Sequence, residues 1–160
     1  MKPIRTALFA PGIRDRLMAQ ALDSGVDAVI LDLEDSVPLA VKTEARAMVV
    51  HVLEGIAASA TPHPVIMVRV NAFSTGLLAE DLSAVVQPGL DVVLLPKAER
   101  VDEITAAAAM IEREEVIRGM RRGAVQIVPM IESALGVVRC FDMLKASERI
   151  AGSCIGTARD

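Results

Sequence analysis

Charged residues stand at or just after the ends of five short apolar runs in this chain, at positions suited to chemistry. They are Asp32, Glu34 and Asp35 after one run, then Arg69, Lys97, Glu132 and Asp160 after the next four. Carboxylates from separate segments, with no His or Cys cluster nearby, suit Mg²⁺, which takes about one or two protein carboxylates besides water or substrate oxygens. An arginine beside such an ion matches the planar binding of a carboxylate or an enolate oxygen. These residue types indicate metal-assisted cleavage or formation of a carbon–carbon bond through an enolate.

Each of these residues, taken alone, also has a structural interpretation. Glu132 precedes Ser133, which fits the capping of a following helix. Arg69 could be an ion-pair partner for the acids of the earlier run, and Lys97 a solvated loop charge. Asp160 could belong to a frayed end. The combination favours a site, because two cations stand among at least four carboxylates.

The elements that must position these residues alternate along the chain. Apolar runs predict strands over 6–10, 28–33, 65–70, 92–95, 125–131 and 150–155. Helical spacing follows Gly12 and stops at Gly25, and it recurs over 41–56, 76–86, 101–117 and 133–146. Such alternation is typical of parallel βαβ units, in which the carboxyl ends of the strands form one rim and carry the site.

Apolar periodicity predicts which face each helix buries. In the helix over 41–56 the inward residues are Ala45, Val49, Leu53 and Ile56, and the outward ones are Lys42, Glu44 and Arg46. In the helix over 133–146 the inward residues are Val137, Phe141 and Leu144. The segment 58–64 contains Pro62 and Pro64, so we expect a surface connection there.

Two α/β architectures fit six strands and five helices. One is an open doubly wound sheet, and the other is an incomplete (β/α)₈ TIM barrel, which normally takes about 250 residues. The absence of a G-x-G-x-x-G fingerprint after any strand lowers the expectation of an open nucleotide-binding sheet. No composition shift divides the chain, so we expect residues 1–160 to form a single, partial barrel domain.

Composition excludes several function classes. The net charge is −4 and the arginines are dispersed, so we expect no nucleic-acid partner. No apolar run approaches the roughly 18 to 20 residues that span a bilayer, and we expect a cytoplasmic protein without a membrane partner. Cys140 and Cys154 are far apart in sequence and have no histidine spaced for a metal site, which predicts reduced, buried thiols.

Five stretches carry a resemblance to a known family. They are LFAPGIRDRLMAQALDSGVDAVILDLEDSV, VRVNAFSTGLLAEDL, PGLDVVLLPKAE, VPMIESALGV and ASERIAGSCIGTARD. In this order and at these separations, the chain resembles the citrate lyase beta-subunit-like family of the HpcH/HpaI aldolase superfamily. The resemblance implies a (β/α)₈ barrel that assembles as a homo-oligomer, a trimer or a hexamer. It also implies Mg²⁺ as the cofactor, held by Glu132 and Asp160.

The same resemblance implies roles for the other rim residues. Arg69 would bind the substrate's carboxylate or carbonyl oxygen and stabilise the enolate. Asp32 and Glu34 would hold Arg69 and metal-bound waters, with Asp35 nearest the reacting group, and Lys97 would lie by the phosphates or the pocket rim. Pyruvate aldolases of the superfamily carry a histidine at the position of Asp35, so the acid favours the acyl-CoA lyase branch.

The implied reaction is cleavage of a 3-hydroxyacyl thioester, of the citryl-CoA or malyl-CoA type, to a 2-oxoacid and acetyl-CoA. The thioester could be carried by CoA or by an acyl-carrier protein. Relatives run longer, so the resemblance implies that the last two strands and a C-terminal closing acid are missing here. Thr157 and Arg159 also depart from the usual pattern before Asp160. The alternative is therefore a catalytically silent ligand-binding or scaffold subunit.

Overall fold

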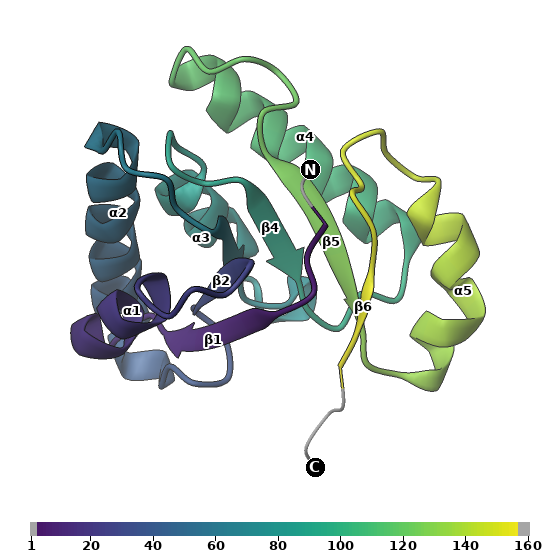
Figure 1. The fold of residues 1–160 in the computed structure, drawn as a ribbon. Coiled ribbons are helices and arrows are strands. Elements are labelled where there is room, and N and C mark those ends of the chain that lie inside the picture. The colour runs from purple at the N-terminus through teal and green to yellow at the C-terminus, as the bar shows by residue number, and fades with distance from the viewer. Residues whose placement is uncertain (1–2, 157–160) are drawn as a thin grey trace.

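A computed structural model describes residues 3–156 of the chain (Figure 1). Its strands are β1 (Ala7–Pro11), β2 (Ala28–Asp32), β3 (Val65–Arg69), β4 (Val92–Leu95), β5 (Gln126–Ile131) and β6 (Cys154–Ile155). Its α-helices are α1 (Asp15–Leu22), α2 (Lys42–Ala58), α3 (Leu78–Val85), α4 (Val101–Ile117) and α5 (Ala134–Leu144). Two 3₁₀ turns, η1 (Leu39–Val41) and η2 (Phe73–Thr75), precede α2 and α3.

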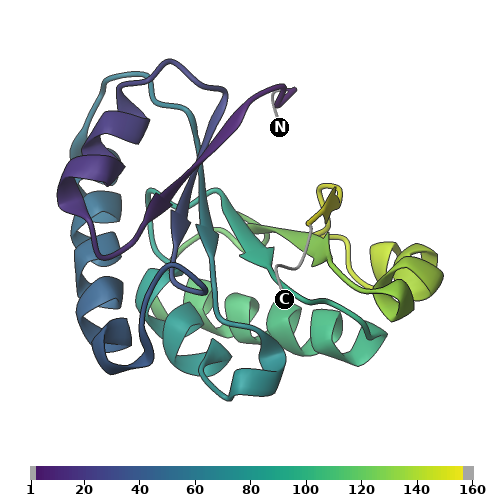
Figure 2. The same cartoon turned by 90° about the horizontal axis from the view of Figure 1, so that it is seen from below.

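The strands form one parallel sheet in the sequential order β1-β2-β3-β4-β5-β6. The sheet curls into a half-barrel, with the helices on its outer, convex side (Figures 1 and 2). Sequential order and one-sided helices exclude the doubly wound alternative for the described residues, because that fold carries helices on both faces of its sheet. The register pairs Asp32 with Arg69 and Arg69 with Leu94, so the ends of these strands lie level at one rim.

Apolar side chains fill both sides of this sheet. The larger core lies between the strands and the helices and includes Leu31, Leu53, Ile66, Leu82 and Ile104. On the concave side a smaller cluster contains Ile30, Met67, Val92, Leu94 and Met130. There the sheet borders an open cavity of about 580 Å³, whose lining also includes residues of β1 and β6.

A close approach of backbones fixes the turn after β1. The Gly12 N–H donates to the Asp32 carbonyl oxygen at 2.8 Å. A Cβ atom at Gly12 would lie only 2.7 Å from that oxygen, so a glycine is required there. This contact ties the end of β1 to the residue that begins the acidic segment.

The predicted elements are confirmed with small changes at their ends. The last strand is shorter than predicted: β6 covers only Cys154–Ile155, and Ile150 makes an isolated bridge to Ile127. Of the predicted surface connection 58–64, residues 59–64 carry no helix or strand, whereas Ala58 is the last residue of α2. Cys140 and Cys154 are free, but both are only half-buried, so the expectation of buried thiols was wrong.

Two predictions of helix faces were wrong. Lys42 and Arg46 of α2 are buried, because their charged ends reach acceptors beneath the rim. Val137 and Phe141 of α5 are exposed, at 62% and 66%, whereas Gly136 and Met143 face the core. Apolar residues lie on more than one side of α5, so periodicity alone could not identify its buried face.

Candidate functional site

The centre of the rim is an ion pair between neighbouring strands. Arg69, at the end of β3, donates from Nε to Asp32 Oδ1 at 2.7 Å and from Nη2 to Asp32 Oδ2 at 2.8 Å. Both side chains are buried, and the strand register places them opposite each other. This two-point contact fixes the plane of the guanidinium group. The Phe9 ring also lies beneath it, 5.0 Å from Arg69 Cζ to the ring centroid.

Asp32 is held as a carboxylate by a full set of donors. Its Oδ1 accepts the Glu34 N–H at 2.9 Å, and its Oδ2 accepts the Ser36 N–H at 3.1 Å and the Ser36 hydroxyl. Burial opposes ionisation, but the hydrogen bonds from Arg69, Ser36 and Glu34 outweigh it, and the pKa of Asp32 lies below its ordinary value. Asp32 therefore serves to orient Arg69 and the following turn.

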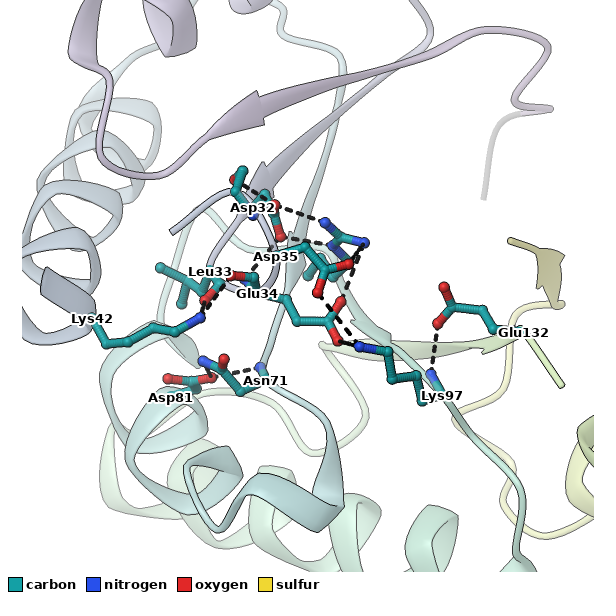
Figure 3. Close-up of polar contacts among 11 residues, drawn as sticks. Asp32, Leu33, Glu34, Asp35, Lys42, Asn71, Asp81, Lys97 and Glu132 are labelled. Atoms are coloured by element: carbon teal, nitrogen blue, oxygen red, sulfur yellow. Dashed lines mark hydrogen bonds and ion pairs between the residues drawn. The ribbon is translucent and has the colours of Figure 1, made fainter. Parts of the chain in front are cut away.

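Glu34 and Asp35 converge on the same two cations (Figure 3). Arg69 Nη1 lies 3.2 Å from Glu34 Oε2 and 3.5 Å from Asp35 Oδ2. Lys97 Nζ lies 2.9 Å from Glu34 Oε1 and 3.4 Å from Asp35 Oδ1. The Asp35 side chain is 61% exposed, whereas that of Glu34 is buried. The exposed acid thus stands at the mouth of the site and the buried one in its wall.

The environment of Glu34 is less complete than that of Asp32. Its oxygens lie at ion-pair distance from Arg69 and Lys97, yet within residues 3–156 neither accepts a well-aligned hydrogen bond. Burial raises the pKa of Glu34, and the two cations only partly offset this effect. A buried carboxylate with unused acceptor capacity suits contact with a further donor, such as a bound water.

Lys97 joins the ends of β4 and β5. Its backbone is left-handed, with φ of 51°, the one positive φ among the described non-glycine residues. This conformation lets its N–H donate to Glu132 Oε2 at 2.8 Å while Nζ reaches the acids after β2 (Figure 3). The ion pair with Glu34 raises the pKa of Lys97 despite partial burial. Backbone strain of this kind often accompanies functional sites.

Glu132 follows β5 but does not cap the next helix. Ser133 caps α5, since its hydroxyl accepts the Gly136 N–H at 3.0 Å. The second oxygen of Glu132, Oε1, accepts no hydrogen bond from the described part of the chain. A Cβ atom added at Gly156 would lie 2.9 Å from that oxygen, so the backbone of Gly156 packs closely against the Glu132 side chain. The capping interpretation of this pair is therefore confirmed for Ser133 and not for Glu132.

The structure thus brings six of the seven predicted residues together: Asp32, Glu34, Asp35, Arg69, Lys97 and Glu132. Asp160 lies outside the described residues. Among residues 3–156 there is no group of three or more His, Cys, Asp or Glu side chains that could hold a metal ion. Within residues 3–156, Arg69 and Lys97 pair with the acids after β2, whereas Glu132 makes no ion pair, so Glu132 can offer an oxygen to a cation.

Sequence reasoning missed a supporting set beneath the rim. Asp81 accepts from Arg46 Nε, the Asn71 N–H and Asn71 Nδ2, each at 2.7 Å, and so ties α2 and α3 to the segment after Arg69. Lys42 donates to backbone carbonyls of the acidic segment. The sequence feature that could have revealed this set is the recurrence of polar residues near the starts of α2 and α3. Helical periodicity, however, predicts that these residues face solvent.

Comparison with known proteins gives concordant matches. The family model of HpcH/HpaI aldolase/citrate lyase matches residues 5–159. Citrate lyase subunit beta of Escherichia coli K12 is 36% identical over 157 residues, which cover 95% of this chain and 49% of the relative. A (3S)-malyl-CoA thioesterase of Cereibacter sphaeroides is 30% identical over 155 residues, which cover 97% of this chain and 49% of the relative.

Solved structures agree with these matches. The citrate lyase beta subunit of Mycobacterium tuberculosis, complexed with oxaloacetate and magnesium, has a TM-score of 0.65 at 30% identity, covering 94% of this chain and 56% of that one. The protein CitE of the same organism, in complex with magnesium, acetoacetate and coenzyme A, has a TM-score of 0.69 at 30% identity, covering 94% and 47%.

These matches show how much of its relatives' length the chain covers and to which family it belongs. It spans about half the length of the curated relatives it matches. None of the helices in the described residues is long and apolar enough to cross a membrane. The rim of charged residues follows the strand ends of a curled parallel sheet, and the family match covers nearly the whole sequence. The chain belongs to the HpcH/HpaI aldolase/citrate lyase family.

Proposed function

We propose that this chain carries the site of a Mg²⁺-dependent carbon–carbon lyase acting on a 3-hydroxyacyl thioester. The substrate would be of the citryl-CoA or malyl-CoA type, carried by CoA or by an acyl-carrier protein. Cleavage would give a 2-oxoacid and the acetyl thioester. The relatives named above include a citrate lyase subunit and a protein bound to magnesium, acetoacetate and coenzyme A, which supports this class of reaction.

The observation that carries the proposal is the fixed guanidinium of Arg69 at the carboxyl ends of the strands. Asp32 holds it in one plane, so little reorganisation is needed when a planar carboxylate or carbonyl oxygen binds. Arg69 would bind the oxygen on which negative charge develops. Lys97, whose side chain is half exposed, would meet the charged thioester end of the substrate or the pocket rim.

The proposed metal ligands are Glu132 and Asp160. The donor set fits a hard cation: Glu132 Oε1 accepts no hydrogen bond from residues 3–156, and Mg²⁺ needs only about one or two protein carboxylates. When bound, the ion would act as a Lewis acid on the oxoacid oxygens. Glu34, buried beside Arg69 and short of aligned donors, would accept a hydrogen bond from a water in this pocket.

The proton balance of cleavage requires a base, and we propose Asp35 for this role. The 3-hydroxyl proton leaves to a base, the carbon–carbon electron pair moves to the thioester as an enolate, and that enolate takes up a proton. Asp35 is the exposed acid of the site, and its carboxylate oxygens lie 3.5 Å from Arg69 Nη1 and 3.4 Å from Lys97 Nζ. We place the hydroxyl proton on an oxygen of Asp35.

A product assay tests the proposal. Purified chain is incubated with citryl-CoA and with malyl-CoA, with Mg²⁺ or with EDTA, and acetyl-CoA release is followed by a coupled reaction. The expected result is Mg²⁺-dependent release that Glu132→Ala abolishes. Release that is unaffected by EDTA or by Glu132→Ala contradicts the metal-lyase proposal. Binding of oxoacid without any turnover supports the silent ligand-binding subunit instead.

Thioester hydrolysis is a second candidate, favoured by the match to a (3S)-malyl-CoA thioesterase. The products of malyl-CoA separate the two reactions, because lysis gives glyoxylate and acetyl-CoA whereas hydrolysis gives malate and CoA. Chromatography of the same incubations identifies the pair. Malate and CoA as the primary products, without acetyl-CoA, would assign hydrolysis to the chain.

We also propose that strands β1 to β6 form part of a (β/α)₈ barrel and that the protein is homo-oligomeric. Sequential parallel order, curl and helices on the convex side support the barrel. The open apolar concave face supports association with further strands or chains.

A further inference from the structure

Lys42 has a costly location for a cation. It is the first residue of α2, its residue exposure is only 8%, and Nζ donates to the Leu33 carbonyl at 2.5 Å and the Glu34 carbonyl at 2.7 Å (Figure 3). Lysine is seldom buried, and the positive end of a helix dipole disfavours a cation in the first turn. Because both burial and the helix dipole disfavour Lys42 here, specific contacts must offset their cost.

The compensation comes from Asp81 and from the acidic segment Asp32–Asp35. Burial lowers the pKa of Lys42, and the nearby charges of Asp81, Asp32, Glu34 and Asp35 oppose that shift. The two carbonyls belong to consecutive residues, so one ammonium group fixes two successive peptide planes. The second of these peptides links Glu34 to Asp35. Its orientation decides where both carboxylates point.

We propose that Lys42 is a positioning residue that holds the backbone of the segment Asp32–Asp35 so that the Glu34 and Asp35 carboxylates face Arg69 and Lys97. Lys42 approaches the segment from its carbonyl side, while Asp32 binds the N–H groups of Glu34 and Ser36. The segment is therefore clamped at its carbonyls by one residue and at its amides by another. The functional part of this inference rests on the proposed function, but the clamp itself does not.

Amide hydrogen exchange, resolved by NMR, tests the clamp. In Lys42→Met the Glu34 and Ser36 amides are expected to exchange about tenfold faster, the effect of losing one or two hydrogen bonds. The Val125 amide, which donates to Glu115 far from the rim, is expected to keep its rate. Lys42→Arg keeps the charge and the donors and is expected to restore protection. Lys145→Met, which removes an exposed lysine of equal charge, is the matched control.

Binding of oxaloacetate in the presence of Mg²⁺, measured by calorimetry, tests the functional part. Lys42→Met is expected to weaken binding by about tenfold, because misplaced polar groups lose affinity steeply, and Lys42→Arg to recover it. Exchange at Glu34 and Ser36 that stays at the wild-type rate overturns the proposal. So does an equal increase at Val125, which would mean general destabilisation.

The two proposals fail in different ways. Wild-type chain that binds no oxaloacetate contradicts the proposed function, while the exchange rates still decide whether Lys42 holds the segment. If Lys42→Met does not fold, Lys42→Gln, which keeps one amide donor group, replaces it in both measurements. Faster exchange confined to Glu34 and Ser36 in that variant supports the proposal, and unchanged or uniformly faster exchange overturns it.

Discussion

At the scale of single residues, the site depends on the planar contact between Asp32 and Arg69. A lysine in place of Arg69 keeps the charge but cannot make two parallel hydrogen bonds to one carboxylate. The buried Asp32 then loses a donor, and Glu34 and Asp35 lose the group they share. The identity of the side chain therefore matters as much as its charge.

Arg69→Lys is expected to reduce turnover of the thioester substrate by about a hundredfold or more, the loss typical of one removed charge-stabilising donor. Steady-state kinetics on citryl-CoA and malyl-CoA measure this effect. Arg5→Lys changes an arginine whose partner, Asp27, lies at the opposite end of the strands, and it is the control. Equal activity of Arg69→Lys and wild type would contradict the role assigned to the guanidinium.

Glu34 is expected to cost the protein stability at neutral pH. Burial raises its folded-state pKa above the unfolded value, so the folded chain binds the proton more tightly. The contribution of Glu34 to stability therefore falls as the pH rises from its unfolded-state pKa through its folded-state pKa. Glu34→Gln removes the charge, and we expect a higher melting temperature at pH 7 and a smaller gain at pH 4.

The same Glu34→Gln variant is expected to bind Mg²⁺ or oxaloacetate more weakly, by about ten- to a hundredfold, as for other residues that support a metal site. Calorimetry and thermal unfolding on one preparation measure both effects. Glu80→Gln, at an exposed acid of α3, is the control for removal of one negative charge. Lower stability at pH 7 would instead identify Glu34 as a structural acid.

At the scale of elements, a buried carboxylate joins α4 to the last residues of the loop before β5 and to Arg149, which precedes β6. Glu115 is fully buried; it accepts the Gly123 and Val125 N–H groups, each at 2.9 Å, and two bonds from Arg149. Burial opposes ionisation, yet these donors outweigh it and lower the pKa of Glu115. This clamp sets where β5 begins and, through β5, where Glu132 lies.

Glu115→Gln is expected to lower the free energy of unfolding by about 3 kcal/mol at pH 7, since it leaves the partly buried Arg149 without its charge partner. Because the pKa of Glu115 is lower in the folded chain, its ionised form stabilises the fold at pH values above the unfolded-state pKa. This stabilisation is lost as the pH falls through the folded-state pKa. The difference between wild type and variant is thus expected to shrink toward pH 3. Urea unfolding at both pH values measures it, with Glu112→Gln on the same helix as the control. A difference independent of pH would contradict the ionised clamp.

The elements and much of the rim were predictable because they depend on local patterns. Apolar runs identify buried parallel strands, and parallel strands bring their carboxyl ends to one edge, so the sequence alone predicts that Asp32, Arg69 and Lys97 lie together. The burial of Lys42 was not predictable. Periodicity ranks side chains by hydropathy, and it carries no information about the Leu33 and Glu34 carbonyl oxygens that accept hydrogen bonds from Lys42. The left-handed backbone of Lys97 likewise depends on a partner 35 residues away.

At the scale of the whole molecule, the described residues leave several large apolar side chains exposed, on α5, on the concave face and on β6 among other places. Val137, Val138 and Phe141 form an exposed strip on α5, with Val138 81% exposed. Phe9 lies on the concave face at 44% exposure, and Ile155 on β6 at 84%. Within residues 3–156 the outer edges of β1 and β6 have no neighbouring strand. Surface of this kind favours association.

We therefore expect the 17.0 kDa chain to associate in solution, with a mass in light scattering that is a multiple of this value and rises with concentration. Val138→Asp places a charge in the α5 strip and is expected to shift the equilibrium toward the monomer, because burying an unpaired carboxylate in an apolar contact is unfavourable. Thr61→Asp adds the same charge in the exposed 59–64 connection and is expected to leave the mass unchanged. A wild-type chain that stays monomeric at all concentrations contradicts the proposed homo-oligomer. Equal effects of the two variants would mean that net charge, and not the α5 strip, controls association.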